Sequence, residues 1–193
     1  MSDKTDLIVE NIKAHICKLS ENKDRFIVAI DGRCASGKTT VGKKLAKMFY
    51  AGLIHIDDFY LPVSKRCENW KEKIAGNIDF NRIKSEILDN IMLDKEYIYC
   101  AYSCRDGKYK DGVHNTPSKI TIIEGSYSLH PSLAHYYDLT VFMDVDTETQ
   151  LERIKKRNGE SQAAVFSTLW IPLEERYLSS YNIIEKCDMY YKT

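Results

Sequence analysis

One short stretch of the chain combines glycines, a lysine and hydroxyl side chains at a spacing that suits phosphate binding. Gly32-Arg33-Cys34-Ala35-Ser36-Gly37-Lys38-Thr39 has the form Gly-x-x-x-x-Gly-Lys-Thr, and Thr40 follows it. Glycines permit backbone angles that turn several N–H groups onto one concave surface, at the positive end of the following helix. Lysine can reach the β- and γ-phosphates, and a threonine hydroxyl can bind Mg2+. The stretch therefore predicts a site for a nucleoside triphosphate.

Acidic residues close four of the apolar segments that we predict to be strands. They are Asp31, Asp57, Glu124 and Asp144. Because the carboxyl ends of parallel strands meet at one edge of a sheet, we expect these side chains to surround the phosphate site. Such acids can bind Mg2+ or accept a proton, and their alternative role is to cap a turn or a helix. Since a protein that only binds a nucleotide needs no base, the pattern favours chemistry on the phosphate.

Asp57 and Glu124 have the most specific settings. A kinase must take a proton from the hydroxyl that attacks the phosphate, and Asp57, with Asp58 beside it, suits that role. Glu124 ends the strand that we expect beside the phosphate-loop strand, so it is a candidate Mg2+ ligand together with Thr39 and Asp57. The ring of Tyr60 is either a wall for an organic substrate or an ordinary part of the core.

Basic residues recur along one edge of a predicted helix that ends at residue 157. Arg153, Lys156 and Arg157 stand at positions i, i+3 and i+4. Phosphoryl transfer needs positive charge over the triphosphate, which makes this edge a candidate for catalysis, and a solvated charged face is the alternative. Residues 153–165 would then form a short lid over the nucleotide.

The elements that must position these residues alternate between strands and helices. Apolar runs predict strands at 26–31, 53–56, 120–123, 139–143 and 188–191. Helical spacing predicts helices at 4–21, 38–50, before 157 and at 172–186, and one that starts after the cap residue Asp79. Two Asp-Gly pairs predict a small β-hairpin near 97–115. This order is typical of an α/β fold with a five-stranded parallel sheet between helices, in a single domain over 1–193.

The composition narrows the class of protein. The 193 residues carry 28 Lys plus Arg and 28 Asp plus Glu, so the formal charge is zero and no basic face for nucleic acid is indicated. No apolar run reaches membrane-spanning length, and the polar N-terminus does not match a secretory signal. The six cysteines show no disulfide framework and are predicted to be reduced thiols. We expect a soluble cytoplasmic protein that binds neither nucleic acid nor membrane, and a homo-oligomer is compatible with the sequence.

Five blocks, kept in order between about residues 25 and 160, resemble the uridine kinase / phosphoribulokinase family. The phosphate loop is common to many families, whereas His55-Ile56-Asp57-Asp58-Phe59-Tyr60 and Glu124-Gly125-Ser126-Tyr127 are the more specific blocks. The other two are Asn77-Ile78-Asp79-Phe80 and Phe142-Met143-Asp144-Val145-Asp146, the latter followed by Arg153 and Arg157.

The resemblance implies a three-layer P-loop kinase fold and transfer of the γ-phosphate of ATP to a primary hydroxyl of a small molecule, with Mg2+. Residues 32–40 would bind ATP, with Lys38 on the phosphates. By resemblance, Asp57 takes the place of the catalytic aspartate and Glu124 that of the metal-side acid. Arg153 and Arg157 match arginines of a lid helix and would offset charge in the transition state.

The same resemblance suggests how the acceptor is held. Asp79 matches an aspartate that holds the ribose hydroxyls in uridine kinases, and Tyr102 falls near a tyrosine that contacts the nucleoside. Arg105 follows in the same hairpin and is a further candidate for acceptor binding. The segment after Tyr102 lacks the histidine expected for reading a pyrimidine, and the lid is short.

Three functions therefore remain open from the sequence. The leading one is a kinase that phosphorylates uridine or cytidine at the 5′-hydroxyl. The second is a kinase of the same fold for another small hydroxyl compound, such as glycerate, pantothenate or a sugar phosphate, since Asp-Asp-Phe-Tyr-Leu-Pro also resembles a block of such kinases. The third is a regulator that binds ATP without transferring its phosphate.

Overall fold

A central parallel sheet organises the computed structural model, which describes residues 2–193. The strand order is β2 (Gly52–His55), β7 (Ile120–Glu124), β1 (Phe26–Gly32), β8 (Leu139–Asp144) and β9 (Met189–Lys192). Every neighbouring pair is parallel, and the register places Ile30 of β1 opposite both Glu124 and Val141. The predicted five-stranded parallel sheet is therefore confirmed, with β7 directly beside the phosphate-loop strand.

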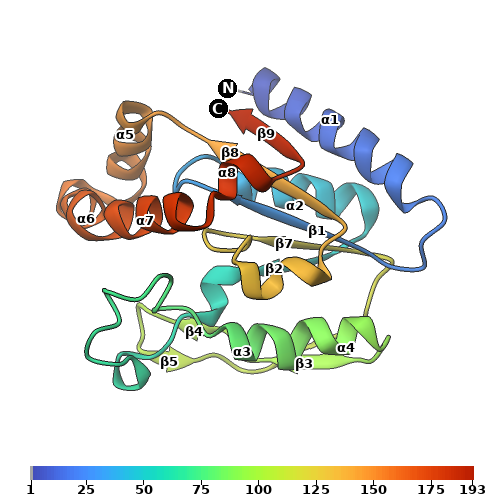
Figure 1. Cartoon of the computed structure of the whole chain (residues 1–193), viewed down its shortest axis with the longest axis horizontal. Helices are drawn as coiled ribbons and strands as arrows, with labels where there is room; N and C mark the ends of the chain where they lie inside the picture. The colour runs from blue at the N-terminus through green and yellow to red at the C-terminus, as the bar shows by residue number, and fades with distance from the viewer. Residues whose placement is uncertain (1) are drawn as a thin grey trace.

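Helices cover both faces of this sheet (Figure 1). On one face, α1 (Ser2–Ser20) and α2 (Lys38–Phe49) pack on Phe26, Val28 and Ile30 of β1. Ile27 and Ala29 point to the opposite face, because successive side chains of a strand alternate. There they meet the segment 80–92 and the C-terminal helices. This three-layer arrangement confirms the predicted fold class.

The helical segment on the second face begins at the residue that the sequence indicated. Asp79 accepts a hydrogen bond from the Arg82 backbone N–H and caps α3 (Phe80–Arg82). The chain continues through a π-helical stretch, Ile83–Leu88, into α4 (Asp89–Met92). The predicted apolar residues Ile83, Ile87, Leu88 and Ile91 are all fully buried.

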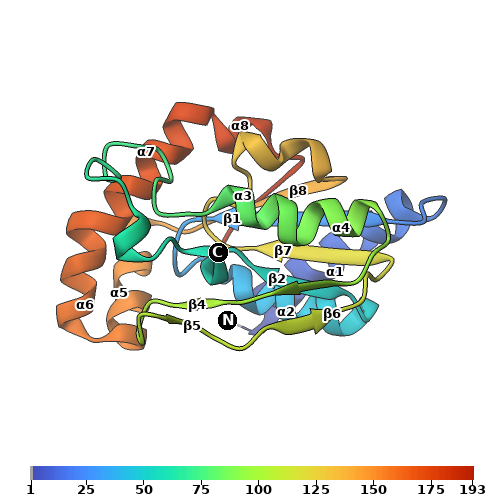
Figure 2. The same cartoon turned by 90° about the horizontal axis from the view of Figure 1, so that it is seen from below.

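The predicted hairpin is present as two short pairs of antiparallel strands. β3 (Tyr97–Tyr99) pairs with β6 (Val113–Asn115), and β4 (Tyr102–Ser103) pairs with β5 (Lys108–Tyr109). Figure 2 shows the hairpin running beneath the sheet, with its β4–β5 tip at the same end of the molecule as α5–α7. That end is where the central strands finish, so the hairpin tip faces the region expected to hold the site.

The C-terminal third differs from its prediction in two places. After the short helical turn Pro131–Tyr136, α5 (Thr147–Asn158) runs to Gly159 as expected. A further helix, α6 (Glu160–Val165), and a π-helical stretch, Phe166–Trp170, then lead into α7 (Ile171–Tyr181), and the sequence had not indicated these two elements. The single helix predicted at 172–186 is wrong, because Asn182 adopts φ 51° and separates α7 from α8 (Ile183–Lys186).

The structure can also be compared with the expectations for membrane-spanning segments, cysteines and metal-binding clusters. None of the described helices has the length and apolar character needed to cross a membrane. All six cysteines are free thiols. Among the described side chains, no cluster of three or more His, Cys, Asp or Glu residues is suited to hold a metal on its own.

Candidate active site

The phosphate loop joins β1 to α2 through a backbone that only glycine accommodates at two points. Gly32 has φ 148° and Gly37 has φ 95°. A Cβ on Gly32 would lie 2.0 Å from the Met143 carbonyl oxygen of β8, which rules out any other residue there. The Lys38 Nζ donates to the carbonyl oxygens of Gly32 at 2.5 Å and Arg33 at 2.8 Å. The Lys38 side chain thus folds back over the phosphate loop, where it would help to bind a phosphate group.

A cavity of about 300 Å3 opens directly above this loop, and we call it the loop cavity. Its wall combines the phosphate loop with side chains predicted for the metal, the base and the lid: Cys34, Ala35, Gly37, Lys38, Thr39, Thr40, Asp57, Tyr60, Glu124, Gly125, Ser126, Arg153, Arg157 and Phe166. The strand order explains this grouping, because β2 and β7 end beside β1. Asp57 and Glu124 therefore face the phosphate loop across one cavity.

Glu124 and Thr39 form a pair of oxygen groups suited to a hard cation. The Thr39 hydroxyl donates to Glu124 Oε2 at 3.0 Å, and the Glu124 side chain is buried. A hydroxyl and a carboxylate, completed by phosphate oxygens and water, match what Mg2+ requires, so the residues fit this ion. His55 Nδ1 contacts the other carboxylate oxygen, and this hydrogen bond raises the pKa of His55.

His55 was not among the predicted site residues. It is the last residue of β2, and the parallel register places it directly opposite Glu124 of β7. A polar residue at the end of an apolar strand, two positions before Asp57, was the available signal in the sequence.

Asp57 lies in a short helical turn, Ile56–Phe59, immediately after β2. Solvent reaches its carboxylate through the cavity, yet protein atoms packed around the cavity displace bulk water and raise the pKa of Asp57. The positive charge of Lys38 and a hydrogen bond with Tyr60 act in the opposite direction. A carboxylate with a raised pKa next to a phosphate site is suited to accept a proton.

The two predicted lid arginines both reach the loop cavity from α5. Arg153 donates from Nη1 to the carbonyl oxygen of Ala35 and to the Thr193 hydroxyl, each at 3.1 Å. Arg157 donates from Nε to Asn158 Oδ1 at 2.7 Å. With Lys38, they place three cations around the space where a triphosphate would lie.

A larger cavity of about 450 Å3 adjoins the loop cavity, and we call it the aromatic cavity. It is lined by five aromatic side chains and by polar, thiol and small apolar groups: Tyr60, Tyr102, Tyr127, Phe166, Trp170, Cys34, Asp57, Val63, Arg66, Cys104, Ser126 and Glu174. The two cavities share five lining residues: Cys34, Asp57, Tyr60, Ser126 and Phe166. Asp57 therefore stands where a phosphate on the loop would meet an organic molecule in the aromatic cavity.

The π-helical stretch before α7 supplies part of this wall. Phe166 and Trp170, at its two ends, both line the aromatic cavity. The Trp170 ring lies 6.5 Å from Tyr60 and 6.0 Å from Trp70 between centroids. π-helical turns are frequent at functional sites, but their register is not visible in sequence periodicity, so neither aromatic residue was predicted.

The residues predicted to bind the acceptor are only partly gathered there. Tyr60 and Tyr102 line the aromatic cavity. Asp79 uses Oδ1 to cap α3 at 3.1 Å from the Arg82 N–H, and Arg105 is exposed in the turn between β4 and β5. Neither belongs to the wall of the aromatic cavity or the loop cavity as described, so their roles stay predictions.

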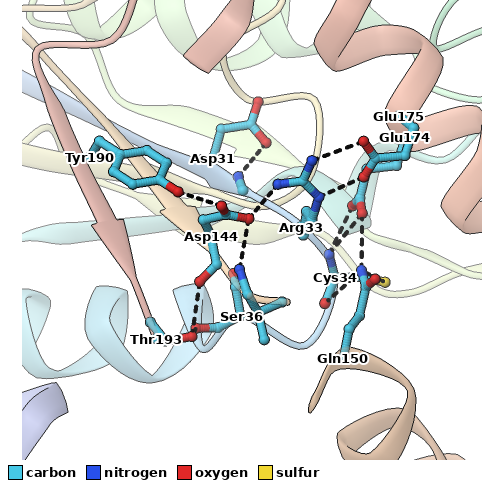
Figure 3. Close-up of polar contacts among 12 residues, drawn as sticks. Asp31, Arg33, Cys34, Ser36, Asp144, Gln150, Glu174, Glu175, Tyr190 and Thr193 are labelled. Atoms are coloured by element: carbon cyan, nitrogen blue, oxygen red, sulfur yellow. Dashed lines mark hydrogen bonds and ion pairs between the residues drawn. The ribbon is translucent and has the colours of Figure 1, made fainter. Parts of the chain in front are cut away.

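Figure 3 shows a network from α7 that fixes the phosphate loop. Both carboxylate oxygens of Glu174 accept the Cys34 backbone N–H, at 2.9 and 3.0 Å, and Oε1 also accepts the Ser126 hydroxyl at 2.7 Å. The next residue, Glu175, binds the Arg33 guanidinium at 2.6 and 2.9 Å, and Asp144 pairs with the same arginine. The loop is therefore held in place from the opposite end of the chain.

Glu174 is a functional candidate that the sequence analysis missed. Only 4% of its surface is exposed, and burial raises the pKa of its carboxyl group. The available signal was its place three and four residues before the buried Tyr177 and Leu178, which puts a carboxylate on the apolar face of a helix.

Asp31 and Asp144 do not line the phosphate site, so the expectation for these two acids is wrong. Asp31 lies behind the loop and accepts hydrogen bonds from the backbone N–H groups of Gly32, Tyr127 and Leu129 and from the Tyr177 hydroxyl. Asp144 contacts Arg33 and the Tyr190 hydroxyl. Both acids stabilise the loop from outside the cavity, because their side chains turn toward donors that the fold brings there.

Comparisons with known proteins agree with the resemblance and the fold. No family model matches the chain. Uridine-cytidine kinase B of Dictyostelium discoideum is 28% identical over 146 residues, covering 69% of this chain and 58% of that protein. A solved structure described as a possible uridine kinase from Bacillus stearothermophilus superposes with a TM-score of 0.73 at 18% identity, covering 98% of each chain. D-glycerate 3-kinase from Cryptococcus neoformans gives a TM-score of 0.62 at 17% identity, covering 87% of each.

These similarities confirm the resemblance to uridine kinases and the P-loop kinase fold. The chain spans 58% of the length of the Dictyostelium relative, so the activity of that whole protein does not transfer directly. The fold itself is also found in a kinase named for a different acceptor. The fold alone therefore does not specify the acceptor.

Proposed function

We propose that this chain is an ATP- and Mg2+-dependent phosphotransferase that moves the γ-phosphate to a primary hydroxyl of a small molecule, with uridine or cytidine as the leading acceptors. One observation carries the proposal: Asp57 lies at the junction of the loop cavity and the aromatic cavity, opposite Lys38 and Glu124. A binding protein would have no use for a base between two such cavities.

Separate groups bind the triphosphate, bind Mg2+, accept the proton and stabilise the transition state. The loop amides and Lys38 hold the triphosphate, while Thr39 and Glu124 hold Mg2+, which when bound draws negative charge away from the phosphate oxygens. Asp57 takes the proton from the acceptor hydroxyl as its oxygen attacks the γ-phosphorus. The bond from that phosphorus to the bridging oxygen breaks, and ADP leaves. Arg153 and Arg157 stabilise the charge that develops during the transfer.

The nucleoside acceptor is supported by the similarity to uridine-cytidine kinase B and by the wall of the aromatic cavity. Tyr60, Tyr102, Tyr127 and Trp170 offer flat apolar surfaces on which a pyrimidine can pack. Asp57 lies at the end of this cavity nearest the phosphate loop, where the 5′-hydroxyl would have to arrive.

Arg66 favours a second candidate, an acceptor that carries a carboxylate or phosphate. Its side chain lines the aromatic cavity, its Nε donates to the Leu61 carbonyl oxygen at 2.9 Å, and its guanidinium lies 4.8 Å from the centroid of the Trp70 ring. Among the side chains that the structure describes, no carboxylate forms an ion pair with it. A fixed, unpaired guanidinium is well suited to bind an anionic group.

An ATP-consumption assay over a panel of acceptors tests both candidates. Uridine, cytidine, glycerate, pantothenate and a sugar phosphate are compared, and the product is identified by mass spectrometry. Turnover on a pyrimidine nucleoside supports the leading proposal, whereas turnover on the anionic compounds alone overturns it in favour of the second candidate.

Arg66→Gln separates the two candidates further. It should raise the KM of an anionic acceptor by about 10-fold or more, the range of a hydrogen bond to a charged group, and change the KM of a nucleoside little. Tight ATP binding with no transfer to any acceptor would instead favour the non-catalytic regulator.

A further inference from the structure

A second opening beside the phosphate loop has no role in the transfer described above. It measures about 360 Å3, and we call it the outer cavity. Ala35, Gly37, Thr40 and Arg153 belong to its wall and also to that of the loop cavity, so the two spaces adjoin. Asp57 and Glu124, which mark the γ-phosphate end, are absent from the described wall of the outer cavity.

The direction of a bound nucleotide follows from this arrangement, provided that the proposed function holds. The γ-phosphate must face Asp57 for the acceptor hydroxyl to reach it. The nucleoside half, at the other end of the triphosphate, must then leave the loop cavity away from Asp57. The outer cavity shares the loop with that space and lies away from the aromatic cavity, with which it has no lining residue in common.

The outer wall of this space comes from the N-terminal helix. Lys4, Thr5 and Ile8 of α1 line it, facing Lys44 of α2 and Thr193. In Figure 1 the start of α1 lies beside the end of β9. Helix α1 is anchored there by the buried side chains of Ile8, Val9 and Ile12 and by an ion pair between Asp6 and Lys44.

The charge of this wall matches an anionic ligand. Lys4 and Arg153 contribute positive charge to this wall, whereas the charge of Lys44 is balanced by its ion pair with Asp6. No carboxylate belongs to the wall among the side chains that the structure describes. Ile8 adds an apolar surface beside them. Cations next to apolar area suit the α-phosphate, ribose and base of a nucleotide.

With the nucleoside half of the donor nucleotide in the outer cavity as the premise, we propose that the first turns of α1, with Lys4, form part of the donor site. The N-terminal helix is then a ligand-binding element in addition to a cover for the sheet. Lys4 acts through its charge, at a position far from the acceptor cavity.

Calorimetric titration of ATP with Mg2+ into matched charge-reversal variants tests this role. Lys4→Glu and Lys18→Glu change the net charge equally and lie on the same helix, and Lys18 stands in its last turn. We expect Lys4→Glu to weaken ATP binding by about 5- to 20-fold at low salt, with a smaller effect at 0.5 M NaCl, and Lys18→Glu to bind like the native chain. Because the proposed role of Lys4 is confined to donor binding, Lys4→Glu should raise the KM of ATP, and the KM of the acceptor should stay the same. Equal affinities for the two variants would overturn the proposal.

Hydrogen exchange gives an independent readout on α1 in the native chain. ATP should slow amide exchange in a peptide that contains residues 4–9, and tripolyphosphate, which lacks the nucleoside, should slow it less. Equal exchange in the two complexes would overturn the placement of the nucleoside. If the native chain binds neither compound, the proposed function fails, whereas binding without these differences contradicts only the role of α1.

Discussion

The two sides of the candidate active site, the loop cavity and the aromatic cavity, are built in different ways. On the phosphate side, hydrogen bonds hold the loop at Arg33, Cys34, Ala35 and Ser36, each from a residue of the C-terminal third. On the acceptor side, the wall consists mainly of aromatic rings contributed by separate segments of the chain. One side is fixed by directional polar contacts, and the other is shaped by packing.

This difference separates what is general in the site from what is specific. Polar contacts of fixed direction preserve one backbone conformation, which any triphosphate can use. Packed rings can change in size and position while leaving that conformation intact, so we expect them to select the acceptor. Substitutions on the two sides should accordingly affect different kinetic constants.

Asp57 belongs to both sides, and its replacement should have the largest effect. Asp57→Asn keeps the shape of the side chain and removes the base, so kcat should fall by about 100- to 10,000-fold. A proton acceptor works only when ionised, and the pKa of Asp57 is raised. Turnover of the native chain should therefore fall as the pH drops through a value above the ordinary aspartate pKa of about 3.9. Steady-state rates between pH 4 and 8 measure both effects.

The stability of the same variant provides a control. A carboxyl group whose pKa is raised by folding binds its proton more tightly in the folded state, so stability falls as the pH rises through the interval between the two pKa values. Asp57→Asn should therefore be at least as stable as the native chain at pH 7.5. A lower melting temperature together with low activity would point to damaged folding, and full activity would remove Asp57 from catalysis.

Replacement of Glu174 should test the polar side alone. In Glu174→Gln an amide N–H2 must face the Cys34 N–H, the Ser126 hydroxyl or the Gln150 amide, which all donate to the carboxylate. Hydrogen bonds to a charged group contribute about 1.5–3 kcal/mol, so kcat/KM for ATP should fall by about 10- to 100-fold.

Glu175→Gln is the matched control for this prediction. Glu175 is the adjacent residue of α7, and its side chain is 44% exposed where it pairs with Arg33. We expect less than a threefold change in kcat/KM for ATP, because exposed ion pairs contribute little. Equal losses in the two variants would show that general loosening of α7, rather than the Cys34 contact, is responsible.

Trp170→Ala should test the packed side. The indole lines the aromatic cavity, and aromatic contacts contribute about 0.5–1.5 kcal/mol, so the KM of the acceptor should rise by about 3- to 10-fold with the KM of ATP unchanged. Trp70→Ala removes the neighbouring ring, which contacts Trp170 but is not part of the described cavity wall, and should have a smaller effect. A rise in the KM of ATP alone would contradict the division between the two sides.

The smallest effect is expected at Cys34, which lies in the phosphate loop. Burial raises the pKa of its thiol to about 12, and only the thiolate reacts readily with electrophiles or peroxide. Cys34 should therefore remain unmodified at pH 7.5 while the exposed Cys17 and Cys67 are alkylated by iodoacetamide, as followed by peptide mass spectrometry. ATP affinity after peroxide treatment should change less than twofold, and a larger loss with oxidised Cys34 would make it a redox-sensitive residue.

The parts of the fold that follow from local sequence were predictable. The phosphate loop is specified by Gly32, Gly37 and Lys38 themselves, and the strands by uninterrupted apolar runs. The cap at Asp79 was also visible, because an aspartate before a helical apolar pattern has a local function. These signals depend on residues only a few positions apart.

The rest of the site depends on partners that are distant in sequence. Asp31 and Asp57 both end apolar strands, yet only Asp57 faces the cavity, because Tyr177 and the backbone near Tyr127 supply donors to Asp31. Glu174 meets Cys34 across 140 positions, which no spacing rule reveals. The π-helical register that turns Trp170 into the cavity is likewise set by tertiary packing.

The attachment of the phosphate loop to α7 and Thr193 has a consequence for synthesis on the ribosome. The loop emerges early, but the carboxylate that holds Cys34 follows 140 residues later. At about 5–20 residues per second, the loop would wait roughly 7 to 30 s for it. We therefore expect the nascent chain to acquire nucleotide affinity only after α7 has been synthesised, so that ATP would stabilise chains that contain α7 and leave shorter ones unsupported.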